Sequence, residues 1–105
     1  MRSNTNSMEI SYAIIAANAT PAAYVLANEK RDYLYKGATR NLKERLKDHA
    51  AGRVSRTKNR RPLILVHLEY CNSYSDALKR ERYFKSGVGR TCLKCRVQSG
   101  QTVPP

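Results

Sequence analysis

The chain of 105 residues has the length of one domain, and its 41% of hydrophobic residues allow a modest core. Twenty Lys and Arg residues against eight Asp and Glu residues give a net charge of +12. This balance disfavours self-association and favours a polyanionic partner, either nucleic acid or an anionic membrane surface. No apolar run of about 18 residues is present, which excludes a membrane-spanning helix.

Residues 1–20 show no firm hydrophobic period and are interpreted as an N-terminal extension. Within them, Tyr12–Ala17 is similar to the apolar part of a signal peptide. This stretch is short, follows Glu9, and has only Arg2 as a positive charge before it. Secretion is therefore the less favoured interpretation, and we expect a cytoplasmic protein.

A β-hairpin and a helix are predicted next. The β-favouring runs Tyr24–Asn28 and Tyr33–Ala38 are separated by a short polar turn. Thr39 or Asn41 can cap the helix that follows, which runs to about residue 51, where Gly52 is placed to stop it.

This first helix has two polar residues, Arg45 and His49, at the edge of its apolar stripe. The stripe itself consists of Leu42, Leu46 and Ala50. The other charged residues of the helix cover the opposite side, so solubility does not explain where Arg45 and His49 lie. Their position suggests a site next to the sheet.

The basic residues are concentrated in one segment. Residues 40–61 contain nine basic residues and two acidic ones, whereas residues 1–39 are almost neutral. Neutralising several phosphates would release counterions, so binding through this segment should weaken with salt. The alternative is that the basic loop of this segment, Arg53–Arg61, is solvated and has no partner. The candidate nucleic-acid contacts are Arg40, Arg53, Arg56, Lys58, Arg60, Arg61 and, farther along the chain, Lys85.

The run Leu63–Tyr70 is the most apolar of the chain and is predicted to be a central strand. Ser73 and Asp76 form a capping-box-like start for a second helix over Tyr74–Ser86. The order ββαβα(α) predicts an α/β fold, an α+β sandwich in which helices flank a small three-stranded antiparallel sheet. Residues 21–91 should form this domain, and residues 92–105 a C-terminal tail.

Glu81 lies on the apolar side of the second helix, between Ala77 and Phe84. A carboxylate there is costly unless a charged group meets it. One interpretation is a salt bridge to Arg45 or another base. The other is a metal ligand or an acid beside a phosphate, because hard carboxylate oxygens suit Mg²⁺. Together with the polar edge of the first helix, Glu81 suggests one shared site.

The cysteines, Cys71, Cys92 and Cys95, are odd in number and include a single C-x-x-C pair. A zinc site completed by His49 or His67 is one interpretation. Reduced thiols without a ligand, in a cytosolic protein, are the favoured one.

Several short motifs follow one another in a fixed order. They are Ala22-Ala23-Tyr24, then Tyr35-Lys36-Gly37, then the helix positions Leu42, Arg45, Leu46 and His49, then Thr57–Pro62, and finally Ala77–Glu81 followed by Lys85–Gly87. In order and spacing, residues 22–90 resemble the GIY-YIG endonuclease superfamily. The resemblance is to its short stand-alone members, which are related to the N-terminal domain of the excinuclease C subunit.

The resemblance implies hydrolysis of DNA phosphodiester bonds, to a 3′-hydroxyl and a 5′-phosphate, and a relation to DNA repair. One divalent cation, Mg²⁺ or Mn²⁺, would be held by Glu81. Arg45 would neutralise the scissile phosphate, and Tyr35 would hydrogen-bond to the same phosphate. Tyr24 would orient or deprotonate the attacking water, while His49 would assist proton transfer or hold a tyrosine hydroxyl.

The chain departs from the family pattern in three places. Ala22-Ala23 replaces the Gly-Ile of the first motif, Lys36 replaces an apolar residue of the second, and no asparagine occurs near Leu93. Strand alternation puts Tyr35 and Gly37 on one face of the sheet and Lys36 on the other, where its stem would have to snorkel. We expect Gly37 to let the first helix approach the sheet closely.

The favoured function is a metal-dependent DNA endonuclease that recognises structure or backbone with little sequence preference. The alternative is a non-catalytic nucleic-acid-binding module that retains the fold. A ribosome-type RNA-binding protein would explain the charge, but not the tyrosines or Glu81. We expect a monomer or weak dimer, with specificity supplied by that dimer or by a partner protein.

Overall fold

The computed structural model of the protein describes residues 8–10 and 20–98. The apolar stretch Tyr12–Ala17 lies outside these residues.

The predicted antiparallel sheet is confirmed. Strands β2 (Ala22–Asn28) and β3 (Leu34–Thr39) form the hairpin, and β4 (Leu63–Tyr70) pairs with the other side of β2. A two-residue strand, β1 (Met8–Glu9), pairs with β4 and was not predicted. The strand order is β1-β4-β2-β3, so β3 is an edge strand and β2 and β4 are central.

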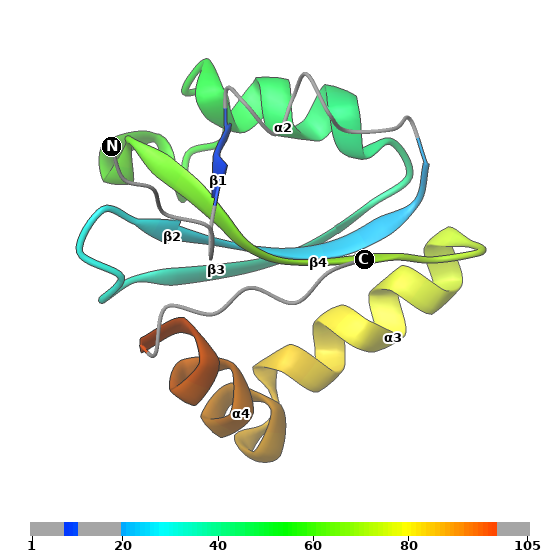
Figure 1. Cartoon of the computed structure of the whole chain (residues 1–105). Coiled ribbons are helices and arrows are strands. Elements are labelled where there is room, and N and C mark those ends of the chain that lie inside the picture. Colours follow the sequence, from blue (N-terminus) through cyan, green and yellow to red (C-terminus); the bar gives the residue numbers. More distant parts are fainter. Residues whose placement is uncertain (1–7, 11–19, 99–105) are drawn as a thin grey trace.

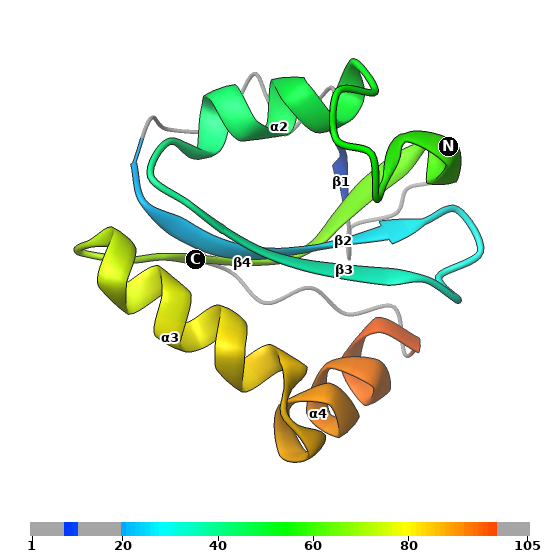
Figure 2. The same cartoon turned by 180° about the vertical axis from the view of Figure 1, so that it is seen from behind.

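Helices cover both faces of the sheet, as the sandwich prediction requires. Helix α2 (Leu42–Ala50) lies on one face, and helices α3 (Tyr74–Lys85) and α4 (Gly87–Gln98) lie on the other (Figure 1; from behind, Figure 2). Strand β2 is buried on both faces, so its alternate side chains enter two separate cores.

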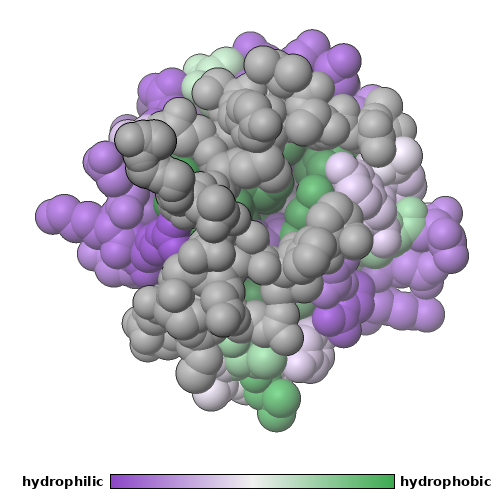
Figure 3. Space-filling model, viewed as in Figure 1, coloured by the Kyte–Doolittle hydropathy of each residue, from purple (hydrophilic) through white to green (hydrophobic). Residues whose placement is uncertain are grey.

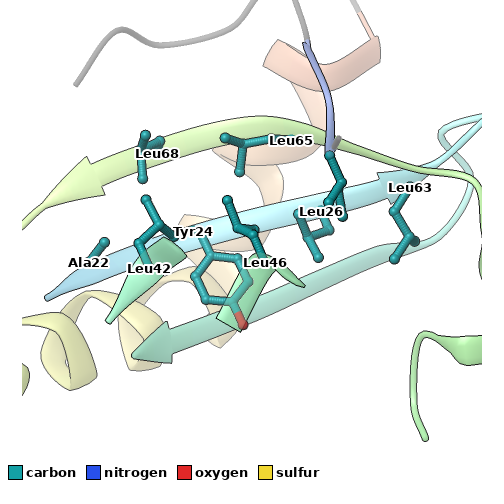
Figure 4. Packing of buried hydrophobic residues seen from close by; sticks show 9 residues of the cluster. Ala22, Tyr24, Leu26, Leu42, Leu46, Leu63, Leu65 and Leu68 are labelled. Atoms are coloured by element: carbon teal, nitrogen blue, oxygen red, sulfur yellow. The ribbon is translucent and has the colours of Figure 1, made fainter. Parts of the chain in front are cut away.

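The core under α2 contains the even-numbered side chains of β2. It consists of Ile10, Ala22, Tyr24, Leu26, Leu42, Leu46, Leu63, Leu65 and Leu68. The core under α3 and α4 consists of Ala23, Val25, Ala27, Val66, Phe84 and Leu93. In Figure 4 the Tyr24 ring lies beside Leu42 and Leu46, with its hydroxyl directed away from Leu65 and Leu68.

Local capping explains where α2 begins and ends. Asn41 is the N-cap, because its side chain accepts the Glu44 N–H. The other candidate, Thr39, accepts the Asn41 N–H through its hydroxyl at 3.1 Å and so positions the cap. Gly52 has φ +79° and its N–H binds the His49 carbonyl, which ends the helix as predicted.

The second predicted helix is confirmed as α3, with Ser73 as its N-cap accepting the Asp76 N–H. Helix α4 then starts at once and continues to Gln98, although the sequence had predicted a tail from residue 92. Leu93 of α4 is buried against Phe84 of α3, and this tertiary contact supports a helix that has little amphipathic pattern of its own.

The outer surface follows the composition. In the view of Figure 3, the coloured surface at the left and right edges of the molecule is strongly hydrophilic, as the excess of Lys and Arg predicts. Within residues 8–10 and 20–98, no helix is long and apolar enough to cross a membrane.

The junction of α3 and α4 generates a prediction. A Cβ atom at Gly89 would collide with the backbone carbonyl of Tyr83, whereas a Cβ at Gly87 would meet no atom within 4 Å. We expect Gly89→Ala to lower the free energy of unfolding by about 1–3 kcal/mol and Gly87→Ala to leave it nearly unchanged. Urea unfolding of both variants tests this. Equal stability would contradict the close approach.

Candidate active site

A buried tyrosine–histidine pair lies between the sheet and α2. Tyr24 and His49 are fully buried, and the Tyr24 hydroxyl lies 2.8 Å from His49 Nε2. Tyr24 is paired with Gly37 across the hairpin. A Cβ at Gly37 would lie 2.5 Å from the Tyr24 ring. Gly37 therefore gives room to the tyrosine ring, rather than to the first helix as the sequence suggested.

Tyr35 and Arg45 complete this cluster. The Tyr35 ring centroid is 5.1 Å from that of His49 and 6.3 Å from that of Tyr24. Burial lowers the pKa of Arg45, but hydrogen bonding to Tyr24 and then to Tyr35 outweighs it, so this pKa is raised overall. The Arg45 side chain is still 40% exposed and lies 3.9 Å from Asp48. Its guanidinium can therefore contact both the tyrosine hydroxyls and a ligand arriving from solvent.

The cluster is neutral apart from Arg45. Burial and the neighbouring Tyr35 raise the pKa of Tyr24 well above its usual range, although Arg45 opposes this. Burial and then the charge of Arg45 lower the pKa of His49 to about 4. At pH 7 the pair is thus a phenol beside a neutral imidazole, which has a free lone pair to accept a proton.

Glu81 reaches this cluster from the other side of the sheet. Its charge raises the pKa of Tyr24, after the larger effects of burial and Tyr35, whereas Arg45 lowers this pKa, so the carboxylate lies within electrostatic range of the hydroxyl. The alternative interpretation, a salt bridge to Arg45 or another base, is met by another base: Glu81 pairs with Lys85 Nζ at 3.2 Å. The Glu81 side chain is 22% exposed rather than fully buried. This exposure arises because α3 packs mainly over β3, the last strand of the sheet.

The donors present suit Mg²⁺ held partly by water and substrate. Among the described residues, no group of three or more His, Cys, Asp and Glu side chains comes together around a metal position. Glu81 offers one partly exposed carboxylate, and Mg²⁺ in phosphate-cleaving sites keeps several waters and binds one or two carboxylates plus phosphate oxygens. The zinc interpretation has less support, because both His49 ring nitrogens and His67 Nε2 have protein partners.

The predicted nucleic-acid contacts differ in whether their side chains have partners within the protein. Arg61 donates to the Ala50 and Lys58 carbonyls, and Arg60 lies 4.2 Å from the Tyr33 ring centroid, so both help to hold the loop. Arg40 lies over the Tyr74 ring, Arg53 pairs with Asp48, and Lys85 pairs with Glu81. Arg56 and Lys58 are exposed and form no ion pair among residues 8–10 and 20–98.

Lys36 lies on the opposite face of β3 from Tyr35, as alternation predicts. The side chain is half-buried. Burial and the positive charges of Arg90 and Lys85 lower the pKa of Lys36. The departure from an apolar residue in the second motif therefore places a further cation near Arg90 and Lys85. Leu93, near the position of the missing asparagine, is a core residue with 3% exposure and adds no polar group to the site.

Two polar features were not predicted from the sequence. Thr57, fully buried in the basic loop, places its hydroxyl 2.8 Å from His49 Nδ1. On the α3 face, Arg80 binds Glu69 through two bonds of 2.7 and 3.0 Å, and His67 Nε2 lies 2.9 Å from the same carboxylate. Thr57 belongs to the motif Thr57–Pro62, which was the only signal that could have marked it.

The family model for the GIY-YIG catalytic domain matches residues 21–91, more than half of the chain. The chain belongs to the GIY-YIG family. This family is one of nucleases, and the tyrosines, arginine and histidine brought together here are among the residues on which the resemblance was based.

The relatives with curated names are UPF0213 proteins, a name that assigns no activity. A relative from Syntrophus aciditrophicus is 48% identical over 54 residues, which is 50% of this chain and 62% of that protein. One from Staphylococcus haemolyticus is 41% identical over 66 residues, 62% of this chain and 80% of the relative. A third, from Lactiplantibacillus plantarum, is 37% identical over 83 residues, which is 68% of this chain and 82% of the relative. No solved structure matches at a significant level.

The buried neutral His49 generates a prediction about stability and pH. In the unfolded chain a histidine takes up a proton below a pKa of about 6.5, whereas folded His49 does so only near pH 4. Because the pKa of His49 is lower in the folded protein, the contribution of this histidine to the free energy of unfolding is complete above pH 6.5. This contribution is lost as the pH falls towards 4. Between pH 7 and 5 the free energy of unfolding should fall by about 2 kcal/mol from this group.

Denaturant unfolding of the parent and of His49→Gln over this pH range measures the effect. The variant should be less stable at pH 7 and should lose this part of the slope. Parallel pH dependences of the two proteins would contradict a buried neutral imidazole.

Proposed function

We propose that the protein is a metal-dependent DNA endonuclease. The observation that carries the proposal is the buried hydroxyl–imidazole contact of 2.8 Å between Tyr24 and His49, next to the partly exposed guanidinium of Arg45. A buried phenol with a raised pKa is a poor base by itself. Beside a neutral imidazole it can take a proton from water while it passes its own proton to Nε2.

Each residue then has a separate role. Water attacks the phosphorus atom while its proton moves to the Tyr24 oxygen and the Tyr24 proton moves to His49. Arg45 stabilises the charge that builds on the phosphate oxygens, and Tyr35 hydrogen-bonds to the same phosphate. The bond from phosphorus to the 3′-oxygen breaks and the leaving oxygen takes a proton from solvent, which gives a 3′-hydroxyl and a 5′-phosphate. A bound Mg²⁺ or Mn²⁺, held by Glu81, would supply Lewis-acid stabilisation of the same charge.

Recognition of the substrate is proposed to depend on the DNA backbone. Arg56 and Lys58 offer exposed positive charge on the loop next to α2, and such contacts carry no sequence information. A single domain of this size reaches few base edges. We therefore expect little sequence preference, with any strong specificity coming from a second copy or a partner protein.

A non-catalytic binding module is the second candidate, and the Glu81–Lys85 ion pair favours it. This pair, at 3.2 Å, already gives the carboxylate a cation, and Lys36 adds positive charge nearby. A module of this kind would use the basic surface but would not need Glu81 for cleavage.

Cleavage assays with Glu81→Gln separate the two functions. The parent, with Mg²⁺ or Mn²⁺, should cut at least one of single-stranded, duplex, nicked or branched DNA. Glu81→Gln should lose on the order of 10²-fold in rate or more, while its DNA binding in EDTA is retained. Glu44→Gln, which removes an exposed carboxylate from α2, is the matched control. DNA binding by the parent without cleavage of any substrate would favour the binding module.

The basic loop generates a separate prediction about affinity. The double variant Arg56→Ser/Lys58→Ser should weaken binding to all duplexes alike and reduce the slope of log K against log salt by up to about 2. Lys79→Ser/Arg82→Ser removes the same charge from exposed positions on α3 and should have a smaller effect. Loss of binding to one sequence only, or an equal effect of the control pair, would contradict backbone contact by the loop.

A further inference from the structure

Thr57 is a buried residue within an exposed basic loop. Its neighbours Arg56 and Lys58 are exposed, but Thr57 has no exposed surface. The Thr57 hydroxyl lies 2.8 Å from His49 Nδ1 and 3.5 Å from the Val54 carbonyl. His49 thus has one partner at each ring nitrogen: Tyr24 at Nε2 and Thr57 at Nδ1.

The proton positions follow from matching donors with acceptors. The positive charge of Arg45 lowers the pKa of Tyr24, against the effect of burial, and so favours the phenol hydroxyl as a donor. The Tyr24 hydroxyl proton then requires an acceptor, and His49 Nε2 lies 2.8 Å away. A neutral imidazole whose Nε2 accepts carries its proton on Nδ1.

The Thr57 hydroxyl oxygen can accept the hydrogen bond that the His49 Nδ1–H donates. The Val54 carbonyl can only accept, so a Thr57 hydroxyl turned towards it leaves an oxygen lone pair for the His49 Nδ1–H. The chain Tyr24, His49, Thr57 and Val54 then has every donor facing an acceptor. In the reverse direction, His49 Nε2 would donate to Tyr24 and the Thr57 hydroxyl would donate to His49 Nδ1, so the Tyr24 proton would lose its nearest acceptor.

We infer that Thr57 is a positioning residue that holds His49 as the Nδ1–H tautomer and so keeps Nε2 open for the Tyr24 proton. Thr57 does not touch the reacting atoms, and it acts through His49. Its catalytic effect rests on the proposed function, whereas its effect on the tautomer does not. The basic loop thereby carries a part of the proton-transfer machinery as well as positive charge.

The tautomer can be measured without any substrate. The protein has two histidines, so the ¹⁵N imidazole spectrum of the untagged chain is simple, and His67→Gln assigns the remaining signals. At pH 7.5 we expect a protonated, pyrrole-type signal at Nδ1 of His49 and a pyridine-type signal at Nε2. Thr57→Val, which removes the hydroxyl at nearly constant shape, should shift His49 towards the Nε2–H form. Thr57→Ser, which keeps the hydroxyl, should restore the wild-type spectrum.

Kinetics test the catalytic consequence. Thr57→Val should lower kcat by about 10–100-fold with KM unchanged within a factor of about two, and Thr57→Ser should recover most of kcat. Duplex binding in EDTA should be the same in all three proteins, which separates a lost proton acceptor from a distorted loop.

The inference and the proposed function fail in different ways. An Nε2–H signal for His49 in the parent, or an unchanged His49 spectrum in Thr57→Val, would overturn the positioning role whatever the enzyme does. A parent protein that shows the expected tautomer but cuts no DNA would instead overturn the endonuclease proposal and leave the structural role of Thr57 supported.

Discussion

The hydroxyl of Tyr24 is a polar group inside the hydrophobic layer between the sheet and α2, and leaving it unpaired there would cost roughly 1–3 kcal/mol. His49 satisfies it from the last turn of α2, which fixes that helix relative to β2. The second ring nitrogen of His49, Nδ1, is also buried and needs a partner, which is the Thr57 hydroxyl. A helix, a central strand and the basic loop are thus held together by one line of buried polar contacts, and the site is built on that line.

The edge position of β3 decides how the site meets solvent. Tyr24 lies under Gly37, and Tyr35 and Lys36 of the same strand face opposite sides of the sheet. Because no described strand lies beyond β3, α3 can bring Glu81 near the hydroxyl cluster without burying it completely. The Glu81 carboxylate, which suits a metal ion, and the Arg45 guanidinium, which suits phosphate, are therefore both partly exposed to a ligand. Tyr24 and His49 are fully buried. That separation favours proton transfer inside and phosphate binding at the surface.

The net charge of +12 is used in two ways. Part of it serves the fold: Arg61 donates to the Ala50 carbonyl at the end of α2, and Arg80 binds Glu69. Part of it faces outward, as at Arg56 and Lys58, where it can meet a polyanion. Arg45 does both, since burial beside the tyrosines orients a guanidinium that solvent still reaches. The count of basic residues therefore overstates the number that are available to nucleic acid.

The sequence by itself determined the hairpin, the central strand, the N-cap of α3, the end of α2 at Gly52, and the family, because these depend on patterns of residues close together in the chain. It also indicated Arg45, His49 and Glu81, since polar groups at the edge or on the face of an apolar helix stripe are visible from periodicity. The Glu81–Lys85 pair is likewise a local contact, four residues apart on α3. The tertiary structure alone decided the partners of His49. Residues that are 25 positions apart, as Tyr24 and His49 are, meet only after the sheet and helix have packed. For the same reason Thr57 is buried in a loop whose composition predicts exposure.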